Sequence, residues 1–469
     1  ADRRSALVDW RVARSRGNDS PRAPVTTPTP ESSPTRSALP SVIVCSMPAE
    51  GHIGPMTSVA RHLVRLGWRV RMLTGAEFES AVTATGAEFL PLPERTGLRR
   101  WERGVAPKGI AAMNEGLKTA FFDPAPAAWA ALRSAVKAEH TDAVLFETTF
   151  LAAFGLQSLP PAERPLSVMC GIVPLGLSSQ DTAPFGLGLA PSSGAVGRIR
   201  NRILTLLARR VILAPVHRHA NRMLVQLGAP RLTERFFIDV LARADLLVQC
   251  TVPTFEYPRS DAPNHLHFIG PIARLAPSRA PLPPWWGQLD GSRPVVHVSQ
   301  GTVANNDFSE LIEPTLAALA DEPVTVVVST GGRPVDELPT LPANALAAEF
   351  LPYDQLFPKT DVFVTNGGYG GLHFAMEHGT AIVVAGDTED KVETSARVAW
   401  SRVGLSLRTG RPSQQAIRDA VRTVLADRRF AERSAAIGAA ISESPGLDGL
   451  VAVVEMALAR SAGNPADPR

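Results

Sequence analysis

A glycine cluster in the C-terminal half of the chain has the composition of a phosphate-binding turn. Within residues 361–379, a short apolar run rich in β-forming residues ends at Thr365, and a helical stretch follows the cluster. The glycines are Gly367, Gly368, Gly370 and Gly371. Exposed N–H groups and the positive end of the helix dipole attract anions, and glycine lets a phosphate approach the backbone closely. The segment therefore predicts a phosphorylated ligand.

A histidine and a glutamate follow two predicted strands in the N-terminal half. His52 lies in the segment 47–55, which we expect to be a loop and which contains neither a GxGxxG nor a P-loop pattern. Its imidazole, with an ordinary pKa of about 6.5, is able to accept a proton at physiological pH. Glu147 ends another predicted strand and is placed to orient that imidazole. The alternatives are a structural histidine and a glutamate that caps a helical segment beginning at Thr148.

Alternating strands and helices in the N-terminal half predict a parallel sheet that positions these residues. A helix is expected at 57–66, after Pro55 and before Gly67. Strands are expected at 41–46, 68–73, 86–90, 142–147, 166–170, 245–250 and 267–269. Residues 171–228 form an insertion whose first part is rich in Pro, Gly and Ser with interleaved Phe185, Leu187 and Leu189. The insertion is either a wall for a hydrophobic small molecule or a helical hairpin that only packs on the domain.

The strand and helix pattern begins again after a proline-rich linker, at 271–294. Strands are expected at 295–298, 324–328, 346–350, 362–365 and 381–385, and helices at 309–320, 372–378, 389–401 and 414–459. We therefore predict an α/β protein with two doubly wound domains, at 41–270 and 295–460, flanked by a disordered leader at 1–40 and a tail at 461–469. The last helix is free to pack back on the N-terminal domain. In such pairs of domains, ligands bind outside the carboxyl ends of the strands.

Composition excludes several classes of protein. The net charge of +3 over 469 residues gives no basic face for a nucleic acid, and no apolar run reaches the ~20 residues of a membrane span. The three cysteines, Cys45, Cys170 and Cys250, are far apart in apolar runs, which favours buried free thiols in a reducing cytoplasm over a disulfide or zinc site. The Pro/Ser/Thr-rich leader lacks the apolar centre of a secretory signal and is weakly compatible with a transit peptide.

Five motifs in this order resemble family 1 nucleotide-sugar glycosyltransferases of the GT-B fold, and most closely the bacterial branch that glycosylates macrolides and other hydrophobic natural products. The resemblance covers about residues 41–460. It implies two Rossmann-like domains that face each other across a cleft. The motifs are Pro48–His52, Val298–Thr302, Phe350–Tyr353, Asn366–Gly371 and Thr388–Lys391.

The resemblance also implies a role for each of these residues. His52 would remove the acceptor proton and Glu147, where the family usually has Asp, would orient it. The diphosphate would bind Thr302 and the turn formed by Asn366, Gly367, Gly368, Gly370 and Gly371. Phe350 would pack near the nucleotide base, the backbone of Leu351 would bind the base edge, and Asp390 with Lys391 would hold the sugar hydroxyls.

Several positions depart from the family pattern and leave the nucleotide and the sugar open. Asn366 replaces a histidine, Gly371 a Ser or Thr, Phe374 a ribose-binding glutamate, and Lys391 a glutamine. The acids at 387 and 390 resemble an Asp-x-Asp metal motif, but a helix cap and a sugar contact explain them more simply. We therefore expect neither a metal nor another cofactor. His373 and His378 receive no role.

The resulting hypothesis is an inverting, metal-independent glycosyltransferase in the cytoplasm. Its substrates would be a UDP- or dTDP-linked sugar and a hydroxyl of a hydrophobic small molecule, with no nucleic acid and no membrane span. A GT-B epimerase or hydrolase, and a non-catalytic protein that binds sugar nucleotides, remain as alternatives. Acceptor, sugar and oligomeric state are not readable from the sequence.

Overall fold

The computed structural model of the chain describes residues 39–94, 109–233, 236–272, 282–302, 305–388 and 390–463. Nearly all of the predicted leader, the centre of the predicted linker and most of the tail lie outside these residues, and so does Glu389 in the last motif.

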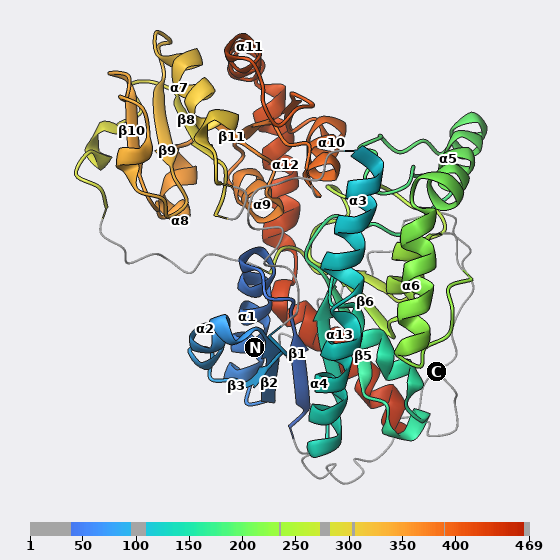
Figure 1. Cartoon of the computed structure of the whole chain (residues 1–469). Coiled ribbons are helices and arrows are strands. Elements are labelled where there is room, and N and C mark those ends of the chain that lie inside the picture. Colours follow the sequence, from blue (N-terminus) through green and yellow to red (C-terminus); the bar gives the residue numbers. More distant parts are fainter. Residues whose placement is uncertain are drawn as a thin grey trace, which may run out of the picture. The chain divides into compact units, whose positions relative to one another are not determined.

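The N-terminal half contains one parallel sheet, as the sequence predicted. Among the described residues its strand order is β3-β2-β1-β4-β5-β6-β7, which reverses direction between β1 and β4. Figure 1 labels most of these strands and the helices around them. The strands are β1 (Ser41–Cys45), β2 (Arg69–Thr74), β3 (Glu88–Pro91), β4 (Ala143–Glu147), β5 (Leu166–Gly171), β6 (Leu246–Gln249) and β7 (Leu266–Phe268). The helices are α1 (Glu50–Arg65), α2 (Glu79–Thr83), α3 (Gly109–Leu117), α4 (Ala125–Ala138), α5 (Ala195–Leu207) and α6 (Ala214–Gln226).

The C-terminal half repeats this plan. Its sheet, in the part of the chain that the structure describes, has the order β10-β9-β8-β11-β12-β13 and reverses between β8 and β11. The strands are β8 (Val295–Ser299), β9 (Thr325–Ser329), β10 (Ala345–Ala348), β11 (Val362–Thr365), β12 (Ala381–Val384) and β13 (Gly404–Ser406). The helices are α7 (Ile312–Leu319), α8 (Tyr353–Leu356), α9 (Tyr369–Glu377), α10 (Lys391–Ser401), α11 (Gln414–Ala426), α12 (Arg429–Glu443) and α13 (Gly446–Gly463).

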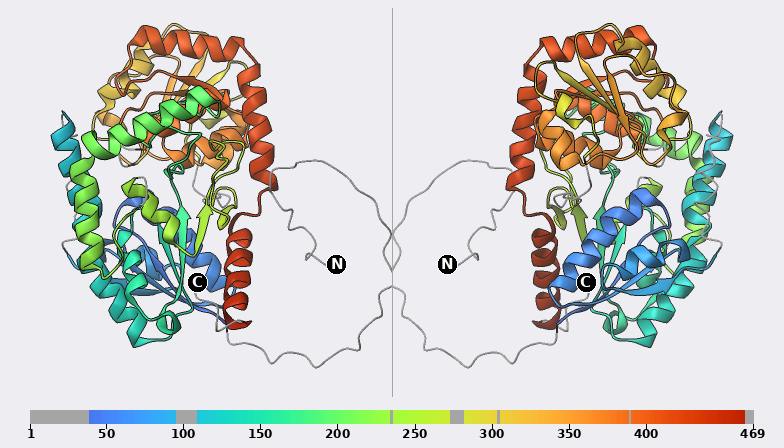
Figure 2. Two further views of the ribbon diagram at one scale, coloured as in Figure 1. Left: turned by 90° about the vertical axis from the view of Figure 1, so that its right-hand side faces the viewer. Right: turned by 90° about the vertical axis from the view of Figure 1, so that its left-hand side faces the viewer.

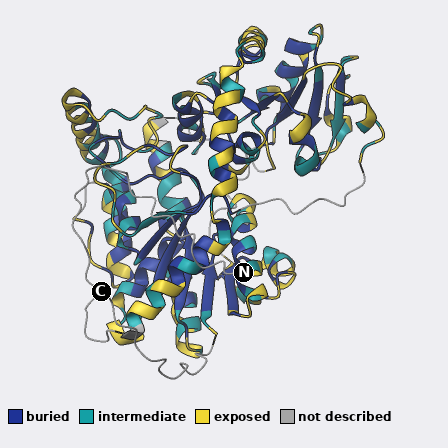
Figure 3. Ribbon diagram, turned by 180° about the vertical axis from the view of Figure 1, so that it is seen from behind, coloured by how far each residue is buried: buried dark blue, intermediate teal, exposed yellow. Residues whose placement is uncertain are grey.

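Both faces of each sheet are buried, which is what parallel strands with continuous apolar runs require. In β1, Ile43 and Cys45 join a core with α4 and α6, whereas Val42 and Val44 join a second core with α1 and α13. Most strand residues are coloured as buried in Figure 3. The sheets are therefore rigid platforms whose loops are free to carry function.

The last three helices correct the prediction of one continuous helical stretch. α12 and α13 meet at a break around Pro445, where the pair bends by 47° (Figure 2). α12 packs on the C-terminal sheet through Ile437 and Ile441, and α13 packs on the N-terminal sheet through Leu450 and Val454. Within the described residues no single helix is long and apolar enough to cross a membrane; the bent pair passes the same test by length and composition.

The insertion between β5 and β6 contains both an irregular segment and helices. Residues 172–194, called the 172–194 loop below, have no regular secondary structure, and α5 and α6 follow. Leu187 and Leu189 in this loop expose 41% and 39% of their surface, and Val196, Ile199 and Ile203 of α5 expose more. The insertion thus presents apolar side chains to its surroundings.

Candidate active site

His52 and Glu147 lie side by side at the strand-order reversal of the N-terminal sheet. Glu147 is the last residue of β4, and His52 follows the neighbouring strand β1. His52 Nδ1 is 3.1 Å from Glu147 Oε2, with the imidazole 21% exposed and the carboxylate fully buried. The imidazole therefore has a carboxylate on its inner side and remains accessible to solvent.

His52 belongs to the first turn of α1, so its prediction as a loop residue was wrong. The helix begins at Glu50 and continues through Pro55, rather than beginning at residue 57. Pro55 leaves only one intrahelical bond unmade, the one to the carbonyl four residues earlier, and Glu50 supplies the negative charge that a helix start favours. The first turn of a helix holds a side chain more rigidly than a loop would.

A network of hydrogen bonds holds the Glu147 carboxylate in place. Thr149 donates from its backbone N–H to Oε2 at 2.6 Å and from its hydroxyl to Oε1 at 2.7 Å. The N–H of Met47 donates to Oε1 at 3.1 Å. The Thr149 hydroxyl also lies 3.1 Å from His52 Nδ1. Glu147 therefore contacts His52 and also accepts hydrogen bonds from the following turn, so the contacts expected from the two alternatives occur together.

The carboxyl group of Glu147 stays ionised despite its burial. Burial alone raises the pKa of Glu147, but the charge of His52 and the hydrogen bonds from His52 and Thr149 outweigh it and bring the pKa below its ordinary value. A buried, ionised carboxylate stabilises positive charge on the adjacent imidazole and so favours its action as a proton acceptor.

The glycine turn of the C-terminal half joins β11 to the start of α9. Gly367 has a φ of 95°, a conformation that glycine adopts without strain, and Gly368 is the N-cap of α9. Gly370 and Gly371 are already in the first turn of the helix, which begins at Tyr369 instead of residue 372. Within the part of the chain that the structure describes, the α9 N-terminus has no side-chain cap hydrogen bond. An ideal Cβ on Gly368 or Gly370 would meet no heavy atom of the described residues within 4 Å, so these residues leave the space at this helix start open.

Asn366 is held within the protein. Its side-chain amide donates to the backbone carbonyl of Gln300 at 2.5 Å, which joins the turn to the loop that contains Thr302. Thr302 itself is exposed and follows Gly301, whose φ is 74°. The loop after β8 and the turn after β11 are thus adjacent, as the predicted diphosphate contacts require.

The predicted donor contacts follow the sheet order. Phe350 and Leu351 come after β10, Thr302 after β8, the glycine turn after β11, and Asp390 with Lys391 after β12. All lie beyond carboxyl ends of parallel strands, where such sheets bind ligands. With strands about 4.8 Å apart, β10 and β12 are separated by roughly 19 Å in this order, enough for an extended nucleotide diphosphate sugar. The predicted base contacts are at one end of this row and the predicted sugar contacts at the other.

Phe350 and Leu351 differ in exposure. The Phe350 side chain is 67% exposed and lies against Gly332, where a Cβ would come within 2.7 Å of the ring. Leu351 is 9% exposed and packs with Val327 and Leu356. A large exposed aromatic ring is available for stacking, whereas the side chain of Leu351 is buried, so the predicted base contact of Leu351 would have to come from its backbone.

Asp390 and Lys391 lie beside the glycine turn. Asp390 is the N-cap of α10 and Lys391 its first residue, with 7% of its surface exposed. A Cβ on Gly386 would meet both Asn366 O and Lys391 Cβ. The Thr394 hydroxyl donates to Gly367 O at 2.8 Å and so joins α10 to the turn. The structure therefore brings the predicted sugar and diphosphate contacts together.

The two unassigned histidines have structural surroundings. His373 is buried in α9, with Nδ1 2.8 Å from Tyr369 O and Nε2 2.7 Å from the Thr251 hydroxyl of the N-terminal half. Burial lowers the pKa of His373 to about 4, so it is neutral near pH 7. His378 ends α9 and stacks on Phe357.

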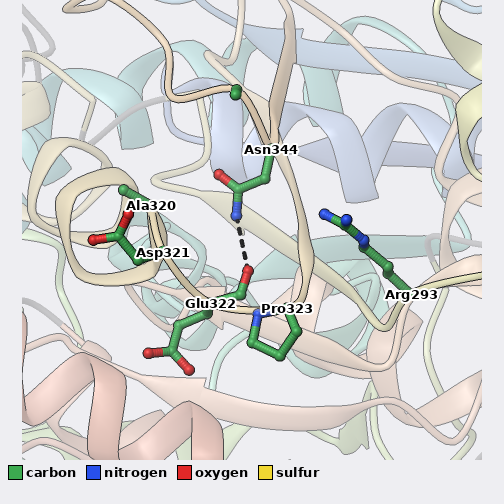
Figure 4. A pocket seen from close by; sticks show the side chains of 7 residues that line it. Arg293, Ala320, Asp321, Glu322, Pro323 and Asn344 are labelled. Carbon is green, nitrogen blue, oxygen red and sulfur yellow. Dashed lines mark hydrogen bonds between the residues drawn. The ribbon is translucent and has the colours of Figure 1, made fainter.

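A surface pocket of about 510 Å³ lies at the amino ends of the strands of the C-terminal sheet, opposite to the carboxyl ends where the predicted donor contacts lie (Figure 4). It is lined by Arg293, which precedes β8, by residues 320–323, which precede β9, and by Ala343 and Asn344, which precede β10. These are amino ends of strands, away from the residues discussed above. Asn344 donates to the Glu322 carbonyl across the pocket at 3.3 Å, as the dashed line shows.

The cysteines are free and buried, as predicted. Burial, with a smaller contribution from the charge of Glu147, raises the pKa of Cys170 to about 12, which makes its thiol unreactive. Among the residues that the structure describes, no group of three or more His, Cys, Asp or Glu side chains is arranged to hold a metal ion.

Sequence reasoning missed several residues around the site. Thr149 completes the pair of His52 and Glu147, and the Glu-Thr-Thr sequence at 147–149 was its only signal. Thr394 fastens α10 to the glycine turn. A buried ionic cluster around Arg397 joins α10 to the N-terminal half, and the spacing of four between Glu393 and Arg397 was its only trace.

Comparison with solved structures shows the fold. The glycosyltransferase of kitacinnamycin aligns with a TM-score of 0.68 and 22% identity over 89% of this chain and 99% of its own. The calicheamicin glycosyltransferase CalG4 aligns with a TM-score of 0.67 and 20% identity over 90% of this chain and 99% of its own. The predicted fold, two parallel-sheet α/β domains of the GT-B type, is confirmed.

Comparison of sequences identifies the family. The 4'-demethylrebeccamycin synthase of Lentzea aerocolonigenes is 41% identical over 83% of this chain and 92% of its own. The UDP-glucosyltransferase 1 of Beauveria bassiana is 35% identical over 84% of this chain and 90% of its own. The family model described as UDP-glucoronosyl and UDP-glucosyl transferase matches residues 188–445. The chain therefore belongs to the family of UDP-glucuronosyl and UDP-glucosyl transferases, and it is a glycosyltransferase.

Proposed function

We propose that this glycosyltransferase moves a sugar from a nucleotide diphosphate to a hydroxyl of a hydrophobic small molecule, with inversion and without a metal ion. The observation that carries the proposal is the contact between His52 and the buried carboxylate of Glu147, at the reversal of strand order. The family membership favours a transferase over the epimerase, hydrolase and binding-only alternatives.

In the proposed reaction His52 takes the proton from the acceptor hydroxyl. Because Nδ1 faces Glu147, Nε2 is the ring nitrogen that accepts the proton. The acceptor oxygen forms a bond to the anomeric carbon while the bond from that carbon to the diphosphate oxygen breaks. One displacement from the opposite side inverts the anomeric configuration. Glu147 stabilises the imidazolium that results.

The leaving diphosphate is stabilised by backbone groups in this proposal. Open N–H groups at the start of α9 and the positive end of its dipole face the space beside Gly368 and Gly370. Preorganised donors of this kind stabilise developing negative charge without reorganisation. Lys391, at the start of α10, adds a positive charge near the same turn. These groups supply the charge stabilisation that a metal ion provides in other transferases.

The proposed donor is a UDP-sugar, with a dTDP-sugar as the second choice. The family description and relatives named UDP-glucosyltransferase support UDP. The proposed acceptor is an apolar natural product that contacts the 172–194 loop and α5, because Leu187, Leu189 and Ile199 are exposed there. We place the reaction in the cytoplasm, where the three free thiols would stay reduced.

Donor consumption measured with and without acceptor tests this proposal. UDP-glucose and dTDP-glucose are each incubated with a panel of phenols and macrolide aglycones, with Mg²⁺ or with EDTA. We expect acceptor-dependent release of the nucleotide diphosphate that EDTA does not reduce, and a glycoside with inverted configuration by NMR. Donor binding without turnover across the panel would contradict transfer, and loss of turnover in EDTA would contradict metal independence.

A further inference from the structure

The carboxylate of Glu393 binds the 172–194 loop to the first turn of α10. Glu393 is 4% exposed. Its Oε1 accepts the backbone N–H of Gly186 at 2.8 Å and that of Gly188 at 3.0 Å. Its Oε2 accepts from Arg397 at 2.9 Å. Both carboxylate oxygens are thus in use, one toward the N-terminal half and one within α10.

The loop lies so close to α10 at this point that it needs glycine. Gly188 has a φ of 58°, and a Cβ there would come within 2.7 Å of Val392 Cγ1 and 3.1 Å of Val392 O. Gly186 has a φ of 95°. The alternating sequence Gly-Leu-Gly-Leu at 186–189 gives its amides to Glu393 while both leucines stay about 40% exposed. Glu393 therefore fixes the direction of two exposed apolar side chains.

A chain of buried charges holds Glu393 itself. Arg397 is fully buried, and its guanidinium contacts Glu393 on one side and Glu256 of the N-terminal half, at 2.6 Å, on the other. Arg259 lies 3.2 Å from Glu256 and closes the chain. Burial raises the pKa of Glu256, and the two arginines outweigh it and bring that pKa below its ordinary value. Two carboxylates and two guanidinium groups thus alternate along the chain, and their opposite charges compensate each other without solvent.

The same turn of α10 carries the predicted sugar contacts. Asp390 and Lys391 come three and two residues before Glu393, and the Glu393 N–H donates to Asp390 O at 2.9 Å. A side chain that binds the acceptor-side loop and a backbone that bears the donor contacts are therefore parts of one helical turn. A shift of Glu393 that follows the loop would therefore also shift the helical turn that contains Asp390 and Lys391.

We propose that Glu393 is a positioning residue that sets the exposed leucines of the 172–194 loop, and hence the acceptor, relative to the donor sugar. This inference rests on the proposed function. A glutamine here keeps only one acceptor oxygen. The buried guanidinium of Arg397, which has only donors, takes that oxygen, so the NH2 group faces the two glycine amides and the loop moves away from α10. The acceptor then binds less well, and water reaches the donor more often.

Replacing Glu393 by glutamine tests this inference, with Glu432→Gln, an exposed glutamate in the first turn of α12, as the matched control. We expect E393Q to raise acceptor KM about tenfold and to increase the ratio of donor hydrolysis to transfer. kcat at saturating acceptor and the Kd of the nucleotide diphosphate, measured by calorimetry, should change less than threefold. E432Q should leave all four quantities as in the parent chain.

Hydrogen exchange supplies a readout that does not depend on turnover. In E393Q the amides of Gly186 and Gly188 should exchange at least tenfold faster than in the parent, whereas the amides of β11 should not change. Gly188→Ala provides a second route, because its methyl group would collide with Val392 and leave the charged cluster intact. It should reproduce the rise in acceptor KM even if E393Q is too unstable to study.

The outcomes separate this inference from the proposed function. An active parent whose acceptor KM is unchanged in E393Q or in G188A would overturn the positioning role alone. Equal losses in acceptor KM and nucleotide Kd would also overturn it, because they would show a general loss of structure. A parent that transfers no sugar to any acceptor would instead overturn the proposed function, while faster exchange at Gly186 and Gly188 would still support the contact between loop and helix.

Discussion

The side chains of His52 and Glu147 lie at the carboxyl ends of β1 and β4 in the N-terminal sheet. At the corresponding point of the C-terminal sheet, where β8 and β11 end, lies the backbone of a glycine turn. The two positions are equivalent in topology, since each is the point where strand order reverses. Yet the first depends on particular functional groups and on a buried charge, and the second on the absence of side chains. The first should fail when a group is removed, and the second when volume is added.

The largest effect should come from removing the imidazole. In His52→Ala, kcat should fall by about 10²- to 10⁴-fold, the usual contribution of a general base, with the Kd for nucleotide diphosphate unchanged. The matched control is His62→Ala, in the same helix α1. Turnover close to the parent value in H52A would remove the basis for calling the N-terminal half the catalytic one.

Adding one methyl group should damage the C-terminal half without unfolding it. Gly370 lies in the first turn of α9, and a Cβ there would meet no heavy atom of the other described residues within 4 Å, the neighbouring helix backbone aside. Gly370→Ala should therefore keep or raise stability, by up to about 1 kcal/mol from helix propensity. Nucleotide diphosphate should nevertheless bind about ten- to a hundredfold less tightly, because the methyl group occupies the space for phosphate. Calorimetry and thermal unfolding measure the two opposite changes.

Gly367→Ala is the contrasting variant. It would place a side chain at a φ of 95° and within 3.0 Å of Thr394 Oγ1 and Val384 Cγ2. It should lower both stability and nucleotide affinity. If G370A bound nucleotide as tightly as the parent, the backbone at the start of α9 would not be the phosphate site.

Glu147→Gln should have a smaller effect on turnover than the loss of His52. It keeps an oxygen that accepts from Thr149 but removes the charge beside His52. We expect kcat to fall about tenfold with acceptor KM nearly unchanged. Kinetics at saturating donor provides the measurement, and a parent-like kcat would mean that Glu147 serves only the fold.

The same variant has a consequence for acid stability. Since the folded-state pKa of Glu147 is lowered, its contribution to stability is fully present above the ordinary carboxyl pKa and is lost as the pH falls through the folded-state value. Glu147→Gln should therefore lose less stability than the parent between about pH 5 and pH 3. Urea unfolding at several pH values would show the difference.

The smallest effect near pH 7 concerns a buried histidine of the C-terminal half. His297 in β8 has Nδ1 3.0 Å from the Val327 carbonyl, and burial lowers its pKa to about 4. The unfolded chain takes up a proton below about pH 6.5, whereas the folded chain does so only below about pH 4. The free energy of unfolding should therefore decrease as the pH falls from 6.5 to 4. The loss approaches about 1.4 kcal/mol for each pH unit between about 6.5 and 4, and it ends where the folded chain also binds the proton. His297→Phe should have a shallower pH dependence of its unfolding free energy than the parent chain.

Both sheets could be predicted from the sequence because each strand is a short apolar run with both faces buried, as in β1 and β11. Helix boundaries were less predictable. Pro55 was taken as a start signal although α1 begins five residues earlier, and the glycines that precede Leu372 hid the first turn of α9. In both cases the residues that break the usual helical pattern are those beside the candidate site.

The residues of the candidate site also divide into those that the sequence predicted and those that it did not. His52, Glu147 and the glycine turn stood out because each lies at the carboxyl end of an apolar strand, and the contact between His52 and Glu147 follows from the neighbouring positions of β1 and β4. Thr149, Thr394 and the Glu256–Arg397 contact did not stand out. Those contacts depend on rotamers and on the packing of segments up to 141 residues apart, which neither spacing nor periodicity encodes.

The packing of α13 on the N-terminal sheet affects how the chain folds during its synthesis. Leu450, Val451, Val453 and Val454 belong to a core whose other buried residues all precede residue 273, so this core stays incomplete until α13 has been synthesised. A fragment that stops at the interdomain linker should expose this apolar face and aggregate. Chimeras that join halves from different relatives should fold only when α13 comes from the same relative as the N-terminal half.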